Sequence, residues 1–224
     1  MDRLESRVAI MSIRYLVNYQ NPSRLTLQRP RIYHPNVLIL QRQQTWFERI
    51  LHVLLSYLPA ASAYWFRESL RQWCLPESIV LKIAKDGWDE EFEREKATYQ
   101  YLRPLQGVTI PRYYGCSEYE GKKALILSNI GGACLATLEG AVLDERDLRE
   151  LVTDALTALS NMGVAYDDTK LDNFHLVTDN GRDKIMIVDL EIVDQSLSEY
   201  DLAFTTECEV NHLIRLYRMH LDCL

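Results

Sequence analysis

The chain has 224 residues, 47% hydrophobic and 25% charged, so it can form one sizeable domain or two small lobes around a hydrophobic core. This composition is that of a folded globular protein and excludes a disordered tail. The formal net charge of -7 argues against a nucleic-acid binder that neutralises backbone phosphates, but not against nucleotide binding, where a metal ion supplies positive charge.

The cysteines and the first residues indicate in which cellular compartment the protein is expected. The 5 cysteines are scattered and contain no C-x-x-C pair, which predicts reduced thiols and neither a disulfide framework nor a zinc site. The first residues, "MDRLESRVAI", mix acids with bases and contain no apolar signal-peptide core. We therefore expect a cytoplasmic protein, with the nucleus as the alternative location.

The first third of the chain combines strands with helices. Residues 6–42 are typical of short strands, as in "RLTLQ" and "NVLILQ", and a helical block follows at residues 45–73. Charged residues and Pro59 interrupt this block, so no transmembrane segment is predicted. We expect a helix pair that packs on the body of the protein, with peripheral membrane contact as the alternative. A protein partner for the helices of residues 45–73 stays open.

The middle of the chain predicts a strand, a helix and a strand pair. "SIVLKIA", residues 78–84, is typical of a buried strand, and "WDEEFEREKATYQYL" predicts a helix with acids in its first turn. Two further strands are expected about a turn at Glu120–Gly121, before a break at Gly131–Gly132.

The remaining elements are mostly helical. Residues 144–161 form a regular apolar stripe behind Asp144, a suitable N-cap, and the last 30 or so residues also favour a helix. Between them, Asn180–Gly181 predicts a hairpin. This order of elements predicts an α+β protein of two lobes that meet near residues 128–134.

Two charged residues fall where burial is expected. Lys82 stands inside the apolar strand, where it is either exposed on an alternating strand or buried and paired. At about 100° per residue, Glu95 lies within the apolar stripe of its helix. Because an unpaired buried charge is costly, Glu95 needs a partner, for which Lys82 is the nearest upstream candidate. Glu91, at the edge of the stripe, is the second choice for this pairing.

The segment "YDDTKLDN" carries the strongest chemical signal. It contains the Asp-x-x-x-x-Asn pair Asp168 and Asn173, with Lys170 between them, and Asp189 follows the next apolar strand. Phosphoryl transfer needs cations at the phosphates, oxygen ligands for Mg²⁺ and a base that orients the nucleophile. Asp168 is suited to act as the base that accepts the hydroxyl proton. Lys170 is suited to neutralise negative charge on the phosphoryl group that is transferred.

The same chemistry gives roles to the remaining candidates. Asn173 and Asp189 offer hard oxygen ligands for a metal ion. Lys82, positioned by Glu95, suits the α- and β-phosphates. As an acid at the end of a buried strand, Asp189 is also compatible with a simple turn.

Over about residues 78–195, the order of motifs resembles that of the protein-kinase-like phosphotransferase fold. These motifs are "SIVLK", Glu95, "YDDTKLDN" and "VDLE". The chain also resembles short kinase-like proteins of fungi. The resemblance implies ATP and Mg²⁺, or Mn²⁺, as cofactors, and an adenine edge that meets the backbone of Ser128 and Ile130. It implies a small, mostly β lobe with a helical insert and with Lys82 and Glu95, residues 1–128, a hinge at 129–132, and a shortened, mostly helical lobe at 133–224. This second lobe contains a catalytic-type loop at 166–173 and a metal-type motif at 189–191.

Departures from the family pattern limit the resemblance. No glycine precedes Gly87, so the Gly-rich loop that grips phosphates is absent from the sequence. Tyr166 stands in place of the usual histidine and Asp167 in place of the arginine of many protein kinases. Asp189-Leu190-Glu191 replaces the usual Asp-Phe-Gly. An acidic residue after this aspartate, here Glu191, resembles the pattern of small-molecule kinases such as choline kinase and the aminoglycoside phosphotransferases. Only 35 residues follow Asp189, without an Ala-Pro-Glu motif, so a small-molecule acceptor is favoured over a peptide.

Three interpretations stay open at this point. The first is an ATP- and Mg²⁺-dependent phosphotransferase with an unknown acceptor. The second is a pseudokinase that binds nucleotide or a protein without efficient phosphate transfer, which the missing glycines favour. The third is an unrelated α+β protein whose residues 166–173 form only an acidic turn.

Overall fold

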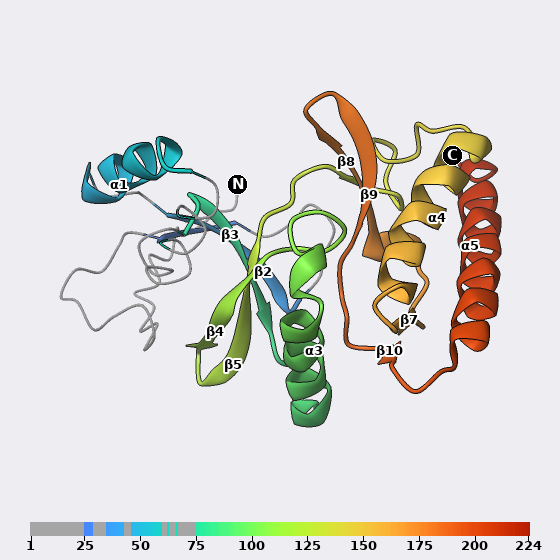
Figure 1. The fold of residues 1–224 in the computed structure, drawn as a ribbon, viewed down its shortest axis with the longest axis horizontal. Coiled ribbons are helices and arrows are strands. Elements are labelled where there is room, and N and C mark those ends of the chain that lie inside the picture. The colour runs from blue at the N-terminus through green and yellow to red at the C-terminus, as the bar shows by residue number, and fades with distance from the viewer. Residues whose placement is uncertain (1–24, 29–34, 43–45, 60–61, 63–65, 67–74) are drawn as a thin grey trace, which may run out of the picture. The chain divides into compact units, whose positions relative to one another are not determined.

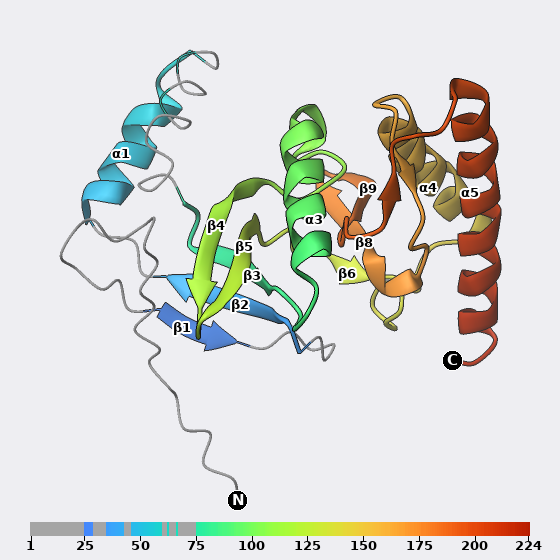
Figure 2. The same ribbon diagram turned by 90° about the horizontal axis from the view of Figure 1, so that it is seen from below.

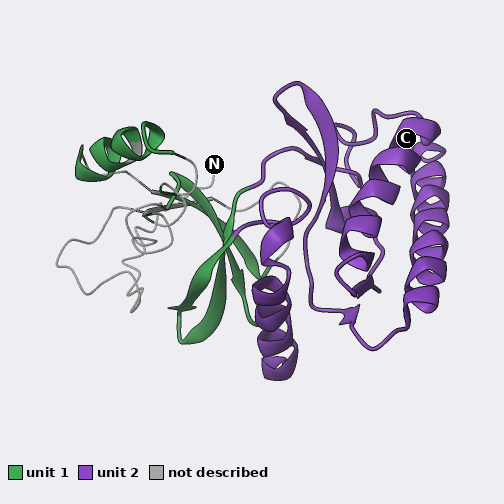
Figure 3. Cartoon of the chain, viewed as in Figure 1, with its two compact units in different colours: residues 1–87, 113–129 green, residues 88–112, 130–224 purple. Residues whose placement is uncertain are grey.

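The computed structural model describes residues 25–28, 35–42, 46–59, 62, 66 and 75–224. The chain forms two compact units, shown in different colours in Figure 3. Unit 1 comprises residues 1–87 and 113–129, and unit 2 comprises residues 88–112 and 130–224. Sheet dominates the first and helix the second, which confirms the predicted α+β class (Figure 1).

Unit 1 is built on a five-stranded antiparallel sheet of strand order β1-β2-β3-β5-β4. The strands are β1 (Leu25–Gln28), β2 (Val37–Arg42), β3 (Ser78–Ile83), β4 (Tyr113–Tyr119) and β5 (Lys122–Ser128). The strands predicted in "RLTLQ", "NVLILQ" and "SIVLKIA" are therefore confirmed. The strands expected before residue 25 lie outside the described residues.

Both predicted hairpin turns are confirmed. Glu120 and Gly121, between β4 and β5, have φ of 51° and 80°, and Asn180 and Gly181 have φ of 52° and 74°. A two-residue turn with positive φ at both positions matches the twist of the strands that it joins, and asparagine and glycine adopt this conformation readily. The second turn joins β8 (Phe174–Asp179) to β9 (Arg182–Ile187).

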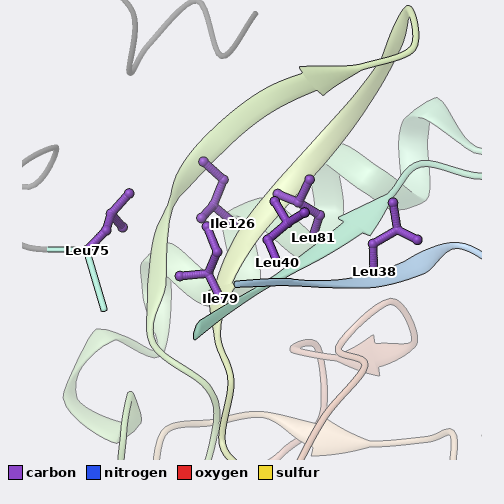
Figure 4. Close-up of a cluster of buried hydrophobic side chains, with 6 residues drawn as sticks. All are labelled: Leu38, Leu40, Leu75, Ile79, Leu81 and Ile126. Atoms are coloured by element: carbon purple, nitrogen blue, oxygen red, sulfur yellow. The ribbon is translucent and has the colours of Figure 1, made fainter. Parts of the chain in front are cut away.

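A cluster of buried aliphatic side chains forms the core of unit 1 (Figure 4). Because side chains alternate along a strand, Ile79 and Leu81 of β3 share one face of the sheet, and Lys82 lies on the other. β3 is a central strand, with β2 and β5 as its neighbours. The cluster comprises Leu38, Leu40, Leu75, Ile79, Leu81 and Ile126.

The predicted helical block begins with helix α1 (Trp46–Ser56), which belongs to unit 1. Most of the block after residue 59 lies outside the described residues. Among the helices that the structure describes, none is long and apolar enough to cross a membrane.

Unit 2 contains three helices, two small sheets and two 3-10 turns. Strands β6, β8 and β9 form one antiparallel sheet, and β7 pairs with β10. The elements not yet given are α3 (Asp89–Tyr101), η2 (Arg103–Leu105), β6 (Ala133–Cys134), α4 (Glu145–Ser160), β7 (Ala165–Tyr166), η3 (Leu171–Asn173), β10 (Val193–Asp194) and α5 (Glu199–Leu221).

Helices α4 and α5 lie side by side in both views (Figure 1, Figure 2). Asp144 caps α4 as predicted, because its carboxylate accepts a hydrogen bond of 2.9 Å from the Asp147 N–H. The Tyr217 hydroxyl of α5 donates to the Leu143 carbonyl oxygen at 3.0 Å. The buried stripe of α4 consists of Leu148, Val152, Ala155, Leu156 and Leu159, whereas Leu151 is half-buried.

Helix α3, which we expected in the first lobe, belongs to unit 2 by its contacts. Two hydrogen bonds join this helix to other segments of unit 2. The Tyr101 hydroxyl donates to the Met162 carbonyl oxygen at 2.8 Å, and the Glu95 carboxylate accepts from the Leu190 N–H at 3.1 Å. The helix ends before Pro104, as its sequence predicts.

Candidate active site

The loop at residues 166–173 closes around the Asp168 carboxylate. Lys170 Nζ lies 2.6 Å from Asp168 Oδ1, and Asn173 Nδ2 donates to Oδ2 at 3.0 Å. The same Nδ2 donates to the Asp168 backbone carbonyl oxygen at 3.0 Å. Charge-assisted bonds to both oxygens fix the orientation of this carboxylate. The three residues singled out in this loop are thus brought together.

The contact with Asp168 stabilises the positive charge of Lys170. The hydrogen bond to Asp168 is the main cause that raises the pKa of Lys170, so its amino group stays protonated. Asn173 is buried, and because its Nδ2 makes both bonds, its amide oxygen remains the group that can bind a cation. The loop therefore presents an oriented carboxylate, an ammonium group and a hard oxygen ligand.

Asp189 has a backbone conformation that is rare for a residue with a side chain. Its φ is 63°, in the left-handed region, which costs free energy unless the surroundings hold it. The Tyr166 hydroxyl lies 3.2 Å from the Val188 carbonyl oxygen and 3.1 Å from that of Asp189. The Asp189 side chain itself accepts from the Glu191 N–H at 3.2 Å. Asp189 is therefore held through both its backbone and its side chain.

Tyr166 links this strand end to the loop of Asp168. Its ring is buried and meets Phe174 edge-on, with 5.7 Å between the ring centroids. Burial is the main cause that raises the pKa of Tyr166 well above its usual value, and the charges of Asp189 and Asp168 add to it. The hydroxyl consequently stays protonated and keeps donating its hydrogen bond.

Three carboxylates gather beside Asp189. One oxygen each of Glu95, Asp189 and Glu191 lies within 4.8 Å of the others, although Glu95 is only 1% exposed. Acidic groups this close repel one another, and a divalent cation among them relieves the repulsion. Oxygen ligands of this kind suit Mg²⁺ and Mn²⁺. Asp189 and Glu191 therefore offer oxygen ligands that fit such an ion, while the Glu95 carboxylate accepts a hydrogen bond from the Leu190 N–H.

Two residues of this arrangement were not among our sequence candidates. Glu191 was noted only as a departure from the family pattern, and Tyr166 only as a replacement for histidine. The Asp-x-Glu spacing of residues 189 and 191 was a usable signal for a second carboxylate. The bond from Tyr166 to the Asp189 carbonyl group had no such signal, because its acceptor is backbone.

The remaining candidates lie in other parts of the chain. Lys82 is only 9% exposed on β3, opposite Leu125 of β5, so of the two alternatives for this lysine the structure shows burial. Ser128 ends β5 in unit 1, and Ile130 is half-buried in unit 2. Glu95 is buried in unit 2, as its helical phase predicted, whereas its pairing with Lys82 stays a prediction.

Comparisons with known proteins agree with this description. A model of the phosphotransferase enzyme family (APH) matches residues 56–175. None of the curated proteins matches the chain. Among solved structures, the PknI kinase domain of Mycobacterium tuberculosis matches with a TM-score of 0.51 and 16% identity, over 85% of this chain and 73% of that one.

Two mutant structures of the same kinase domain give nearly the same result. A single mutant matches with a TM-score of 0.51, 16% identity and the same coverage. A double mutant matches with a TM-score of 0.51 and 15% identity, over 85% of this chain and 74% of that one. At such identities the similarity shows the fold alone, which is that of a protein kinase domain.

Proposed function

Because the chain belongs to the phosphotransferase enzyme family and has a protein-kinase-like fold, we propose that it transfers a phosphoryl group from ATP in the presence of Mg²⁺ or Mn²⁺. The observation that carries this proposal is the Asp168 carboxylate, held at one oxygen by Lys170 and at the other by Asn173. An oriented base beside a fixed cation is what transfer to a hydroxyl group needs.

Each residue of the loop has a distinct part in this proposal. Asp168 accepts the proton of the attacking hydroxyl group, and Lys170 offsets the negative charge that develops on the phosphoryl group. Asn173 and Asp189 bind the metal, and Glu191 adds a third oxygen ligand. When bound, the metal neutralises charge on the phosphates.

The nucleotide-binding residues rest on the family resemblance. Lys82 holds the α- and β-phosphates and Glu95 positions it, which would account for a lysine buried on a central strand. The backbone of Ser128, at the end of β5, and of Ile130, in the hinge segment of residues 129–132, meets the adenine edge.

We favour a small-molecule acceptor over a peptide. Glu191 supports this choice, because an acid after the metal-type aspartate resembles the pattern of small-molecule kinases.

Thermal unfolding with ATP and Mg²⁺ or Mn²⁺ tests the proposal. A ligand at about 100 times its Kd adds about 2.7 kcal/mol to the free energy of unfolding, which is readily seen as a rise in Tm. We expect Asp189→Ala to lose the metal-dependent part of this rise. Asp168→Ala should keep it while turnover falls about 100-fold or more, because only proton transfer is removed.

Asp167→Ala is the matched control, because it removes an exposed carboxylate from the position next to Asp168. We expect this variant to bind and turn over like the wild type. The absence of any Tm shift with millimolar Mg-ATP would contradict the proposal.

A pseudokinase is the second candidate, favoured by one specific observation. No glycine precedes Gly87 in the sequence, although the resemblance places the phosphate-gripping Gly-rich loop before Lys82. Under this alternative the wild type binds Mg-ATP with the expected Tm shift, but hydrolysis and transfer match those of Asp168→Ala.

A further inference from the structure

Helix α1 presents a hydrophobic stripe to solvent. At about 100° per residue, seven exposed apolar side chains of the helix and its C-terminal extension fall within an arc of about 140°. Leu54 is 59% exposed and Tyr57 is 82% exposed, in the middle and at the end of this stripe. The α1 stripe consists of Trp46, Phe47, Ile50, Val53, Leu54, Tyr57 and Leu58.

The opposite side of α1 is the buried one. Glu48 and Leu55, which lie about 180° to 200° from Trp46 on the helical wheel, are both buried. A surface helix of a globular protein normally buries most of its apolar side chains, whereas α1 buries Leu55 and leaves the seven side chains of the stripe exposed. A large exposed apolar patch of this kind marks an interaction surface.

The charge of the surrounding sequence identifies the chemistry of the partner. Residues 1–75 contain ten arginines, no lysine and four acidic residues, whereas residues 76–224 contain fifteen basic and twenty-eight acidic residues. Although the whole chain has a net charge of -7, its first third, residues 1–75, has an excess of basic residues, and α1 lies in this part. Arginine-rich sequence before and after an exposed apolar helix favours an anionic partner surface.

We propose that α1 binds the surface of membranes rich in anionic lipids. The apolar side chains of the α1 stripe enter the boundary between headgroups and acyl chains, with Trp46 and Tyr57 as interfacial anchors at its two ends. Arg49, on the exposed polar side, lies near the lipid phosphates. With 11 residues, α1 is too short to span a bilayer and suits a position parallel to its surface.

The aromatic anchors and the arginines favour lipid over a second copy or a partner protein. Tryptophan and tyrosine prefer the membrane–water interface, where one part of the side chain is apolar and the other is wet. An excess of arginine brings affinity for any anionic bilayer without requiring a complementary protein surface. This inference concerns where the chain binds and is independent of its phosphotransferase activity.

Flotation of the full chain with lipid vesicles tests the inference. We expect binding to phosphatidylcholine vesicles that contain about 30% phosphatidylserine, weaker binding to phosphatidylcholine alone, and weaker binding in high salt. Leu54→Asp should lower the bound-to-free ratio about tenfold or more, because it places a charge in the stripe.

Phe204→Asp on α5 is the matched control, because Phe204 is 62% exposed and the substitution adds the same charge outside the stripe. We expect it to bind vesicles like the wild type. Tyr57→Asp repeats the test at the most exposed position of the stripe, should Leu54→Asp fail to fold. Phosphate transfer to a soluble acceptor should be the same for both stripe variants as for the wild type.

Three results would overturn the inference. The first is that the wild type does not bind anionic vesicles. The second is that both stripe variants bind these vesicles as well as the wild type does. Alternatively, the wild type is a dimer that the stripe variants dissociate, without any vesicle binding, which assigns the stripe to a second copy of the chain.

Discussion

At the scale of single residues, Tyr166 is the support of the candidate metal-binding strand end. Its hydroxyl group donates to the carbonyl oxygens that flank the strained Asp189 backbone. We expect Tyr166→Phe to lower the free energy of unfolding by about 1 kcal/mol, because a buried acceptor loses its donor. We also expect weaker Mn²⁺ binding, because Asp189 is less constrained. Urea unfolding and a Mn²⁺ titration measure the two effects.

Tyr217→Phe is the control for this prediction. Tyr217 is equally buried, and its hydroxyl group donates to the Leu143 carbonyl oxygen at 3.0 Å and accepts from the Leu143 N–H at 3.1 Å. The Tyr217→Phe variant should lose about as much free energy of unfolding as Tyr166→Phe does, without any change in Mn²⁺ affinity. Equal loss of Mn²⁺ affinity in both variants would show that Tyr166 acts only through general stability.

The buried tyrosines also predict an alkaline limit to stability. Burial is the main cause that raises the pKa of Tyr99 and of Tyr166 well above the usual value, so the folded state keeps protons that the unfolded chain releases. Their contribution is fully present below pH of about 10 and is lost as pH rises from there towards the folded-state pKa. Each tyrosine then costs about 1.4 kcal/mol per pH unit.

Urea unfolding between about pH 9 and pH 11 measures this loss. Tyr166→Phe should reduce the steepness of the decline by one tyrosine's share. Tyr200→Phe, which removes a highly exposed side chain, should leave the decline unchanged. A decline that is identical in all three proteins would contradict the assignment to Tyr166.

At the scale of elements, the Gly131–Gly132 break is constrained by packing at one glycine only. Both have positive φ, 63° and 73°, which costs a residue with a side chain about 1–2 kcal/mol. A Cβ atom on Gly132 would also overlap the Leu176 carbonyl oxygen and lie 2.8 Å from Val177 Cγ2, whereas one on Gly131 meets nothing within 4 Å. The break is therefore tight against β8 at Gly132.

A matched pair of alanine substitutions tests this difference. Gly131→Ala should lower the free energy of unfolding by about 1–2 kcal/mol, and Gly132→Ala by about 3 kcal/mol or more, because backbone must also move. Urea unfolding of the two variants gives the comparison. Equal losses would show that the backbone conformation alone sets the cost at both positions.

The elements were largely predictable because their signals are local. The apolar spacing behind Asp144 predicts α4 within about a residue of its observed bounds, and Asn180–Gly181 predicts the turn between β8 and β9. Helical phase was also enough to place Glu95 in the core. Lys82 could not be decided in this way, because alternation along a strand shows which residues share a face but not what covers that face.

The less predictable part of the site depends on tertiary contacts and backbone conformation. The positive φ of Asp189 leaves no mark in a sequence, because aspartate is common both in turns and at metal sites. The approach of Glu191 to Glu95 joins residues nearly one hundred positions apart, on segments whose packing no local pattern describes. Sequence motifs therefore located the loop of Asp168 better than they located the carboxylate cluster.

At the scale of the whole molecule, the division into two compact units predicts separate responses to core mutations. Leu81 of β3 and Leu159 of α4 are both fully buried, one in each unit. Replacing either by alanine should cost about 2–5 kcal/mol, because the lost methyl groups leave a cavity. Each cost should fall on the unit that contains the leucine, because Leu81 belongs to the core cluster of unit 1 and Leu159 to the buried stripe of α4 in unit 2.

Native-state hydrogen exchange separates the two costs. In Leu81→Ala, amides of β2, β3 and β5 should exchange faster while those of α4 and α5 stay protected, and Leu159→Ala should show the opposite pattern. Because the two substitutions remove the same atoms from equally buried sites, each variant is the control for the other. Faster exchange of both sets of amides in both variants would instead show that the two units open as one cooperative structure.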